Sequence, residues 1–284
     1  MKKQKNNSAW MALPLYIFTI VFVICPLLYV VALSFATPNR GYGVTWKFTL
    51  DNYKNILEPV YLNTFVESLK LALTSTAAIV LIGYPFGYFM AKLPEHRKKK
   101  AHLLLTLPFW VNSLIRLYGW IIILQKKGLL NFVLMKLGLI KRPLAILYSY
   151  PAIVVGMIYV LLPFMIMSVY SSAEKLDWSY VEAARDLGAS RVQAFFTVTL
   201  KLTLPGLLSG VILTFVPSMG LFFIADILGG NKIVLVGSLI QDQMTRGSNW
   251  PFAAALAVVM MVLTTVMIMI YRKVSNAREL EGIG

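Results

Sequence analysis

The sequence predicts an all-α polytopic membrane protein with six transmembrane helices. The chain of 284 residues is 58% hydrophobic, with a mean hydropathy of +0.71, which is more apolar than a soluble domain of this length. Its apolar residues also gather in six runs, each close to the roughly 20 residues that a helix needs to cross a bilayer. Helices are expected because lipid offers no partners to unpaired backbone groups. The alternating ten-residue segments typical of a β-barrel are not found.

The six predicted spans follow one another along the whole chain. The first apolar run follows three lysines, but it is longer than the 7–15-residue apolar region of a signal peptide, so we expect a retained helix. After it comes a long polar gap, residues 36–62, whose segment "WKFTLDNY" predicts an ordered outer segment rather than a linker. The predicted spans are residues 10–35, 65–91, 102–124, 150–171, 202–223 and 251–271.

Glycines and prolines inside these spans predict close packing and kinks. Gly83 and Gly87 of the second span are four residues apart, and so are Gly206 and Gly210 of the fifth. Such pairs let helices approach closely in lipid. Neighbouring helices compensate for prolines within spans, and broken helices often line a cavity. The prolines in question are Pro85, Pro108, Pro163 and Pro217.

The net charge of +15 would suggest nucleic acid as a partner of a soluble protein. Here the basic residues lie in the predicted loops, so we interpret them as topology signals and expect no nucleic acid partner. With the N-terminus in the cytoplasm, 15 of the 27 Lys and Arg residues fall on the cytoplasmic side and 10 on the other. The dense "HRKKK" cluster at 96–100 is the strongest single signal. We therefore predict that both termini are cytoplasmic.

Motifs for catalysis or nucleotide binding are missing from the sequence. It has no phosphate-binding loop, no HExxH and no CxxC, and no serine stands in a G-x-S-x-G elbow. The one cysteine, Cys25, lies inside the first span, which leaves no intrachain disulfide and no thiolate metal site. We predict a chain without catalytic residues that binds no metal or other cofactor itself, and a membrane enzyme is disfavoured.

A short polar segment, "YVEAARDLGAS" at 180–190, separates the fourth and fifth predicted spans. Asp177 or Ser179 is a suitable helix N-cap, and Ser179 with Glu182 fits a capping box. Gly188 is a typical helix stop. An amphipathic stretch follows at 190–200, so the loop is expected to form a helix–turn–helix. The first helix is either a well-capped surface helix or a docking helix, whose small alanines let a partner approach and whose charges orient it.

This loop resembles the EAA loop of the permease subunits of bacterial ABC importers, whose pattern is E-A-A, three residues, G, nine residues, I-x-L-P. Glu182, Ala183, Ala184 and Gly188 match the pattern. Lys201 replaces the usual proline, which leaves the start of the fifth span open. The resemblance implies a type I importer (MetI-like) bundle in which this loop, with Asp186, inserts into a separate ATPase. That ATPase would bind the ATP and Mg²⁺ and rock the spans between inward-open and outward-open states.

Similarity to the permease subunits of spermidine/putrescine importers runs nearly end to end. It implies a multi-pass protein of the bacterial inner membrane that pairs with a homologous second permease, a dimer of ATP-binding subunits and an extracytoplasmic polyamine-binding protein. The implied division is 1–62 for the first helix and outer segment, 63–272 for the permease core with its coupling loop at 172–201, and 273–284 for a cytoplasmic tail. The segments that carry the similarity are "FTLDNY", "PFWVNSLIRLYGW", "EAARDLGAS", "MGLFFIADILGG" and "NWPFAAA".

Ionisable residues inside spans are costly and suggest function. Carboxylates and aromatic rings together suit amine cations. The alternative for Glu67 is a local ion pair with Lys70 on the same helix face, and aromatic residues also gather at membrane interfaces. Arg116 argues against a purely cation-attracting pore, unless it pairs with a carboxylate or gates the path. The predicted pathway residues are Glu67, Trp110, Asn112, Arg116, Phe222 and Asp226.

Two other readings stay open at this point. An ABC importer for ferric iron, sulfate or phosphonate would carry the same EAA loop, although an anionic substrate favours basic residues along the pathway. An ion-coupled secondary transporter would need no ATPase, but no internal inverted repeat is detectable in the chain.

Overall fold

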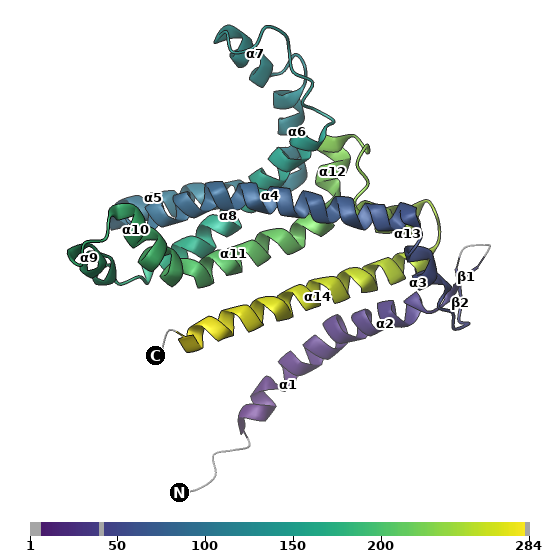
Figure 1. Cartoon of the computed structure of the whole chain (residues 1–284). Coiled ribbons are helices and arrows are strands. Elements are labelled where there is room, and N and C mark those ends of the chain that lie inside the picture. Colours follow the sequence, from purple (N-terminus) through teal and green to yellow (C-terminus); the bar gives the residue numbers. More distant parts are fainter. Residues whose placement is uncertain (1–6, 40–42, 282–284) are drawn as a thin grey trace, which may run out of the picture. The chain divides into compact units, whose positions relative to one another are not determined.

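Helices make up nearly all of the regular structure in the computed structural model of the protein, which describes residues 7–39 and 43–281 (Figure 1). Lys2, Lys3 and Lys5 of the predicted N-terminus and the last three residues of the predicted tail lie outside this part. The chain divides into two units. The first unit comprises Met1–Leu62 with Leu239–Thr265, and the second comprises Asn63–Ser238 with Val266–Gly284.

The first unit begins with one long apolar helix that changes its winding in the middle. It consists of α1 (Asn7–Thr19), a π-helical turn (Ile20–Ile24) and α2 (Cys25–Ser34). Pro26 stands in the first turn of α2 and has no amide hydrogen to donate, which matches the local departure from α-helical bonding.

In the part of the outer segment that the structure describes, residues 36–39 and 43–62, the chain is ordered, as the sequence predicts. The short strands β1 (Thr37–Pro38) and β2 (Val44–Thr45) pair antiparallel, and α3 (Asp51–Ile56) follows them. The side-chain amide of Asn52 donates to the carbonyl oxygens of Ser34 and Ala36, both at 2.9 Å. These bonds satisfy carbonyl groups at the buried end of α2, where the last carbonyls have no partner within the helix.

Three helices of the second unit pack so closely that glycine is required at their contacts. They are α4 (Pro59–Ala91), α8 (Tyr150–Glu174) and α11 (Leu200–Gly220). A Cβ atom on Gly87 would lie 2.7 Å from the carbonyl oxygen of Ile166 in α8. One on Gly206 of α11 would lie 2.3 Å from the Cβ of Ser172, also in α8. The predicted glycine pairs of α4 and α11 therefore both face α8.

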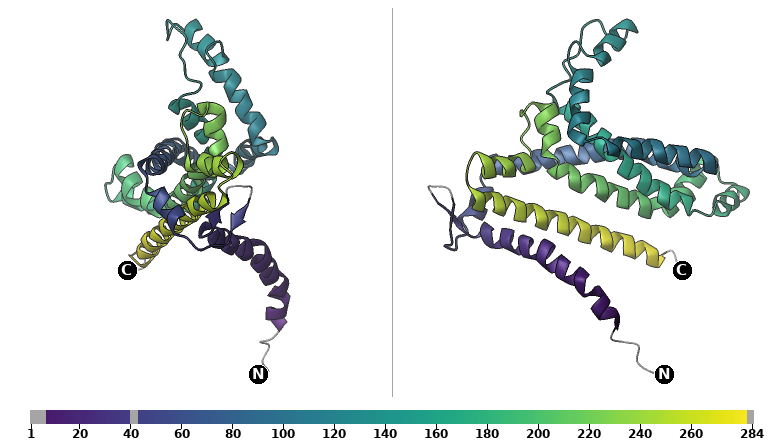
Figure 2. Two further views of the ribbon diagram at one scale, coloured as in Figure 1. Left: turned by 90° about the vertical axis from the view of Figure 1, so that its right-hand side faces the viewer. Right: turned by 180° about the vertical axis from the view of Figure 1, so that it is seen from behind.

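The third predicted span, 102–124, is wrong as a single helix. The chain forms α5 (Glu95–Thr106), a 3₁₀ turn (Leu107–Trp110) and then α6 (Ser113–Leu124). Pro108 interrupts the hydrogen bonding, and the side chain of Asn112 caps the new helix by accepting from the amide of Leu114 at 2.8 Å. Figure 2 shows α6 leading away from α4 and α8 toward α7 (Leu129–Lys136).

The basic start of α5 is bound to the end of α8. The ammonium group of Lys98 lies 3.1 Å from a carboxylate oxygen of Glu95 and 3.2 Å from one of Glu174. Both hydrogen bonds raise the pKa of Lys98 above its usual value, and the bond to Glu95 has the larger effect. Lys98, one of the basic residues at 96–100 that predict the topology, thus also links α5 to α8.

Beyond α11, the second unit continues to Ser238, and residues 239–265 belong to the first unit. Leu221 leaves the helical conformation, and α12 (Phe222–Gly229) turns back against α8 and α6. After a loop, α13 (Val236–Thr245) begins, and α14 (Trp250–Glu281) is the last helix. A Cβ on Gly237 would lie 2.8 Å from the carbonyl oxygen of Gly220, so the start of α13 approaches the junction of α11 and α12 very closely.

Within the described ranges, six segments are helical, long and apolar enough to cross a membrane, which confirms the predicted number. The third of them lies further along the chain than predicted, and the fifth begins earlier. The six segments are Leu13–Ser34, Pro59–Ala91, Ser113–Lys136, Tyr150–Glu174, Arg191–Gly220 and Trp250–Lys273.

Candidate functional site

The first helix between α8 and α11 is the short α9 (Ser179–Asp186), which we call the docking helix. It ends as predicted at Gly188, whose φ of +91° lies in the left-handed region. The amide of Gly188 donates to the carbonyl of Arg185, and that of Ala189 donates to the carbonyl of Ala184, both at 3.0 Å. This pair of bonds is a Schellman motif, which satisfies the last carbonyls of the helix.

The predicted capping box of Ser179 and Glu182 is not formed. Trp178 is already helical, so Ser179 lies inside the first turn and its side chain cannot cap the helix. Asp177 accepts from the amide of Ser179 at 3.0 Å instead, and this bond holds the pKa of Asp177 below its usual range. A capping box occurs eleven residues later, where the side chain of Ser190 accepts from the amide of Gln193.

The docking helix presents an exposed surface. Leu187, directly after it, is 90% exposed, and Tyr180 is 59% exposed. Among the predicted coupling residues, Glu182, Ala183, Asp186 and Gly188 are exposed and Ala184 is half-buried. The charged side has an open hollow of about 470 Å³ lined by Glu182, Arg185, Asp186, Ala189, Ser190 and Arg191. A surface with both an apolar and a charged part suits a protein partner.

The expected helix–turn–helix is formed by α9, residues 187–190 and α10 (Arg191–Ala194). Its second helix is not separate from the fifth span, because α10 passes through a π-helical turn (Phe195–Thr199) directly into α11. Lys201 lies inside α11, and the helix bonding continues past the position where the family pattern has a proline.

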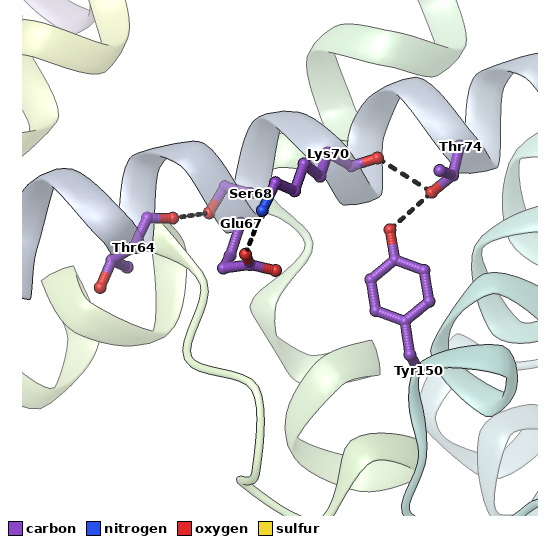
Figure 3. Close-up of polar contacts among 6 residues, drawn as sticks. All are labelled: Thr64, Glu67, Ser68, Lys70, Thr74 and Tyr150. Atoms are coloured by element: carbon purple, nitrogen blue, oxygen red, sulfur yellow. Dashed lines mark hydrogen bonds and ion pairs between the residues drawn. The ribbon is translucent and has the colours of Figure 1, made fainter.

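Glu67 lies on α4 near Ser68 and Thr74, whose hydroxyl groups hydrogen-bond to other parts of the chain (Figure 3). Its carboxylate accepts from the ammonium of Lys70 at 2.7 Å, which is the local ion pair that the spacing predicts. One residue further, the hydroxyl oxygen of buried Ser68 accepts from the amide of Val236 at 2.9 Å. On the other side, the hydroxyls of Thr74 and Tyr150 are 2.7 Å apart. Glu67, which is 44% exposed, is therefore held on a part of α4 that is fixed to α13 and α8.

Asp226 is on α12, and its carboxylate accepts from the hydroxyl of Ser238 at 3.0 Å. Ser238 follows Val236 by two residues at the start of α13, and Val236 is bonded to Ser68 beside Glu67. Residues 236–238 thus connect the surroundings of the two predicted carboxylates, which are 159 positions apart in the chain. Ser68 and Ser238 are not among the predicted pathway residues. For Ser68, its place next to Glu67 in an apolar helix is a usable signal.

The other predicted pathway residues occupy separate places. The guanidinium of Arg116 lies 5.4 Å from the ring centroid of Tyr159 and 5.9 Å from that of Phe109. Trp110 is 78% exposed, and Asn112 serves as the N-cap of α6. Phe222 packs edge-to-face on its neighbour Phe223 with ring centroids 6.2 Å apart.

Among the residues whose structure is described, no group of three or more His, Cys, Asp or Glu side chains is placed to hold a metal ion. The site features therefore consist of a docking surface at one end of the second unit and a set of carboxylates, hydroxyls and aromatic rings elsewhere in it.

Comparison with known proteins relates these features to a family. Residues 83–279 match the family model of the binding-protein-dependent transport system inner membrane component. The chain is 43% identical to the spermidine/putrescine transport system permease protein PotB of Salmonella typhimurium (strain SL1344), over 90% of each chain. It is 41% identical to PotB of Haemophilus influenzae, over 92% of each.

A solved structure shares the fold. In the crystal structure of a bacterial alginate ABC transporter in complex with an alginate pentasaccharide-bound periplasmic protein, one chain superposes with a TM-score of 0.72 at 17% identity. The match covers 95% of this chain and 93% of that one.

The protein belongs to the family of inner membrane components of binding-protein-dependent transport systems, and it is a multi-pass protein of the inner membrane. Its fold is that of a type I ABC importer permease, as the sequence predicts.

Proposed function

We propose that the chain is the permease subunit of an ATP-driven importer that moves polyamines, spermidine or putrescine, into the cytoplasm. The observation that carries this proposal is the 43% identity to a spermidine/putrescine permease over 90% of both chains. A match of this extent includes the spans and the loops together, and is not confined to the EAA loop that all importers of this class share.

The docking helix is the proposed contact with a separate ATPase. Its Schellman stop and the helix continuing into α11 give it a defined shape, while its outward residues stay exposed. In this assembly the ATP and Mg²⁺ bind to an ATPase dimer, and this chain binds no cofactor. A homologous second permease and an extracytoplasmic polyamine-binding protein complete it, with both termini of this chain in the cytoplasm.

The proposed pathway uses carboxylates and rings because a polyamine is a chain of ammonium groups. Glu67 and Asp226 supply charge-assisted hydrogen bonds, and Trp110 and Phe222 supply ring faces. Asn112 contributes an amide at the turn into α6. The carboxylate of Glu67 is paired with the ammonium of Lys70 at 2.7 Å, and an ammonium group of the substrate would take the place of the Lys70 ammonium. The guanidinium of Arg116 lies over the rings of Phe109 and Tyr159, and its positive charge limits the passage of cations.

The test is uptake by the full transporter in proteoliposomes, with all subunits present. We expect ATP-dependent uptake of labelled spermidine that excess putrescine reduces and excess sulfate does not. Glu182→Ala in the docking helix should lower uptake and ATPase association together. The matched control, Glu58→Ala, removes an exposed carboxylate before α4 and should leave both unchanged.

Competition by sulfate, ferric iron or a phosphonate in place of polyamines would overturn the substrate assignment. Uptake by the permease in vesicles without ATP would instead support an ion-coupled transporter. Unchanged uptake and ATPase association in Glu182→Ala would refute the coupling role of the docking helix.

A further inference from the structure

One lysine at the end of α4 lies against two aromatic rings at the start of the docking helix. The Nζ atom of Lys92 is 4.3 Å from the ring centroid of Tyr88, four residues earlier on α4, and 4.6 Å from that of Trp178. The two rings meet edge-to-face at 5.8 Å. Trp178 directly precedes the docking helix, so these three residues, which we call the aromatic clamp, join α4 to the first turn of that helix.

The other end of the docking segment is also bound to α4. Phe195, the first residue of the π-helical turn, packs edge-to-face on Tyr84 and Tyr88 with ring centroids 5.9 Å and 5.7 Å apart. The hydroxyl of Tyr84 is 2.8 Å from that of Thr203 in α11. Tyr84 and Tyr88 are four residues apart on one face of α4, and Lys92, the first residue after this helix, continues the spacing.

The two attachments differ in what they connect. Phe195 belongs to a helix that continues into α11, so its movement follows that span in any case. Trp178 follows α8 after residues 175–177, and the clamp attaches it to α4. Between the attachments, Glu182, Ala183 and Asp186 are exposed. A displacement of the docking helix is therefore passed from the N-terminal end of the docking helix, through the clamp, to α4.

We propose that the aromatic clamp of Tyr88, Lys92 and Trp178 is a positioning device that transmits displacement of the docking helix to α4, the helix that carries Glu67. The proposal rests on the proposed function, because it takes the docking helix as the ATPase contact. A cation–π contact suits this role because it depends on the ammonium staying over the ring face. It holds two helices in one arrangement while leaving the exposed surface of the docking helix unoccupied.

The test compares variants of the full transporter in proteoliposomes by the number of polyamine molecules imported per ATP hydrolysed. Lys92→Met keeps the apolar stem and removes the ammonium, whereas Lys92→Arg keeps a cation over the rings. Lys99→Met, an exposed lysine on α5, is the control for the same loss of charge. Trp178→Leu tests the same contact by removing the indole ring over which the Lys92 ammonium lies.

We expect Lys92→Met and Trp178→Leu to lower the import-to-hydrolysis ratio by roughly two- to fivefold, the equilibrium effect of an exposed cation–π contact. Lys92→Arg and Lys99→Met should keep the wild-type ratio. Amide exchange at 179–182 should become faster in Lys92→Met and not in Lys99→Met.

An unchanged ratio in Lys92→Met, or equal losses of uptake and hydrolysis, would overturn the proposal, because a general structural defect reduces both together. Failure of the proposed function looks different. It appears in the wild-type transporter as missing ATP-dependent polyamine uptake, and the exchange measurement then still decides whether the clamp holds the docking helix.

Discussion

Two regions of the second unit require glycine for opposite physical reasons. Gly206, on α11, faces α8, and there is no room for a Cβ atom beside Ser172 and the Ser168 carbonyl. Gly188, after the docking helix, has no atom within 4 Å of the place of its missing Cβ, yet its φ of +91° disfavours any other residue. Glycine is thus required between the packed helices because a side chain would clash there. After the docking helix it is required because of the backbone conformation alone.

The largest effect is expected from Gly206→Ala. The new methyl group would lie 2.3 Å from the Cβ of Ser172 and 2.7 Å from a backbone oxygen, so α8 and α11 must separate. Overpacking of this kind costs about 1–3 kcal/mol. Thermal unfolding in detergent measures it, with Gly119→Ala as the matched control because that position is open. Equal melting temperatures of the two variants would show that the close helix contact is not rigid.

A smaller and more local effect is expected from Gly188→Ala. A left-handed conformation costs an L-residue about 1–2 kcal/mol, and here the cost should appear as unwinding of the end of the docking helix. Hydrogen exchange at the amides of Gly188 and Ala189 measures it. Gly188→Asn should lie between alanine and wild type, because asparagine tolerates this conformation better. If alanine and asparagine both exchange like wild type, the Schellman stop contributes nothing.

The smallest effect is expected at Asp177. Its pKa is held below the usual range by the amide of Ser179, so its stabilising bond is fully present above the ordinary aspartate pKa. It is lost only as the pH falls through the lowered value. Amide exchange of Ser179 should therefore be protected at neutral pH and lose protection in acid, and Asp177→Ala should abolish this acid dependence. An acid dependence that persists in the variant would assign the effect to another group.

The sequence alone predicts the features that depend on composition or on neighbouring residues. The number of spans follows from apolar runs of membrane length, and the helix stop follows from Gly188 because the left-handed conformation is a local property. The glycine pairs at 83 and 87 and at 206 and 210 are also visible in the sequence, although their common partner, α8, is not.

Only the tertiary structure decided which residues far apart in the chain meet. The docking helix directly follows Trp178, whose indole ring contacts Lys92 and Tyr88, and the predicted capping box of Ser179 is not formed. In the same way, Ser68 and Ser238 connect the surroundings of Glu67 and Asp226 through bonds across up to 168 positions. Local patterns carry no information on such pairings, because these depend on how whole helices pack against one another.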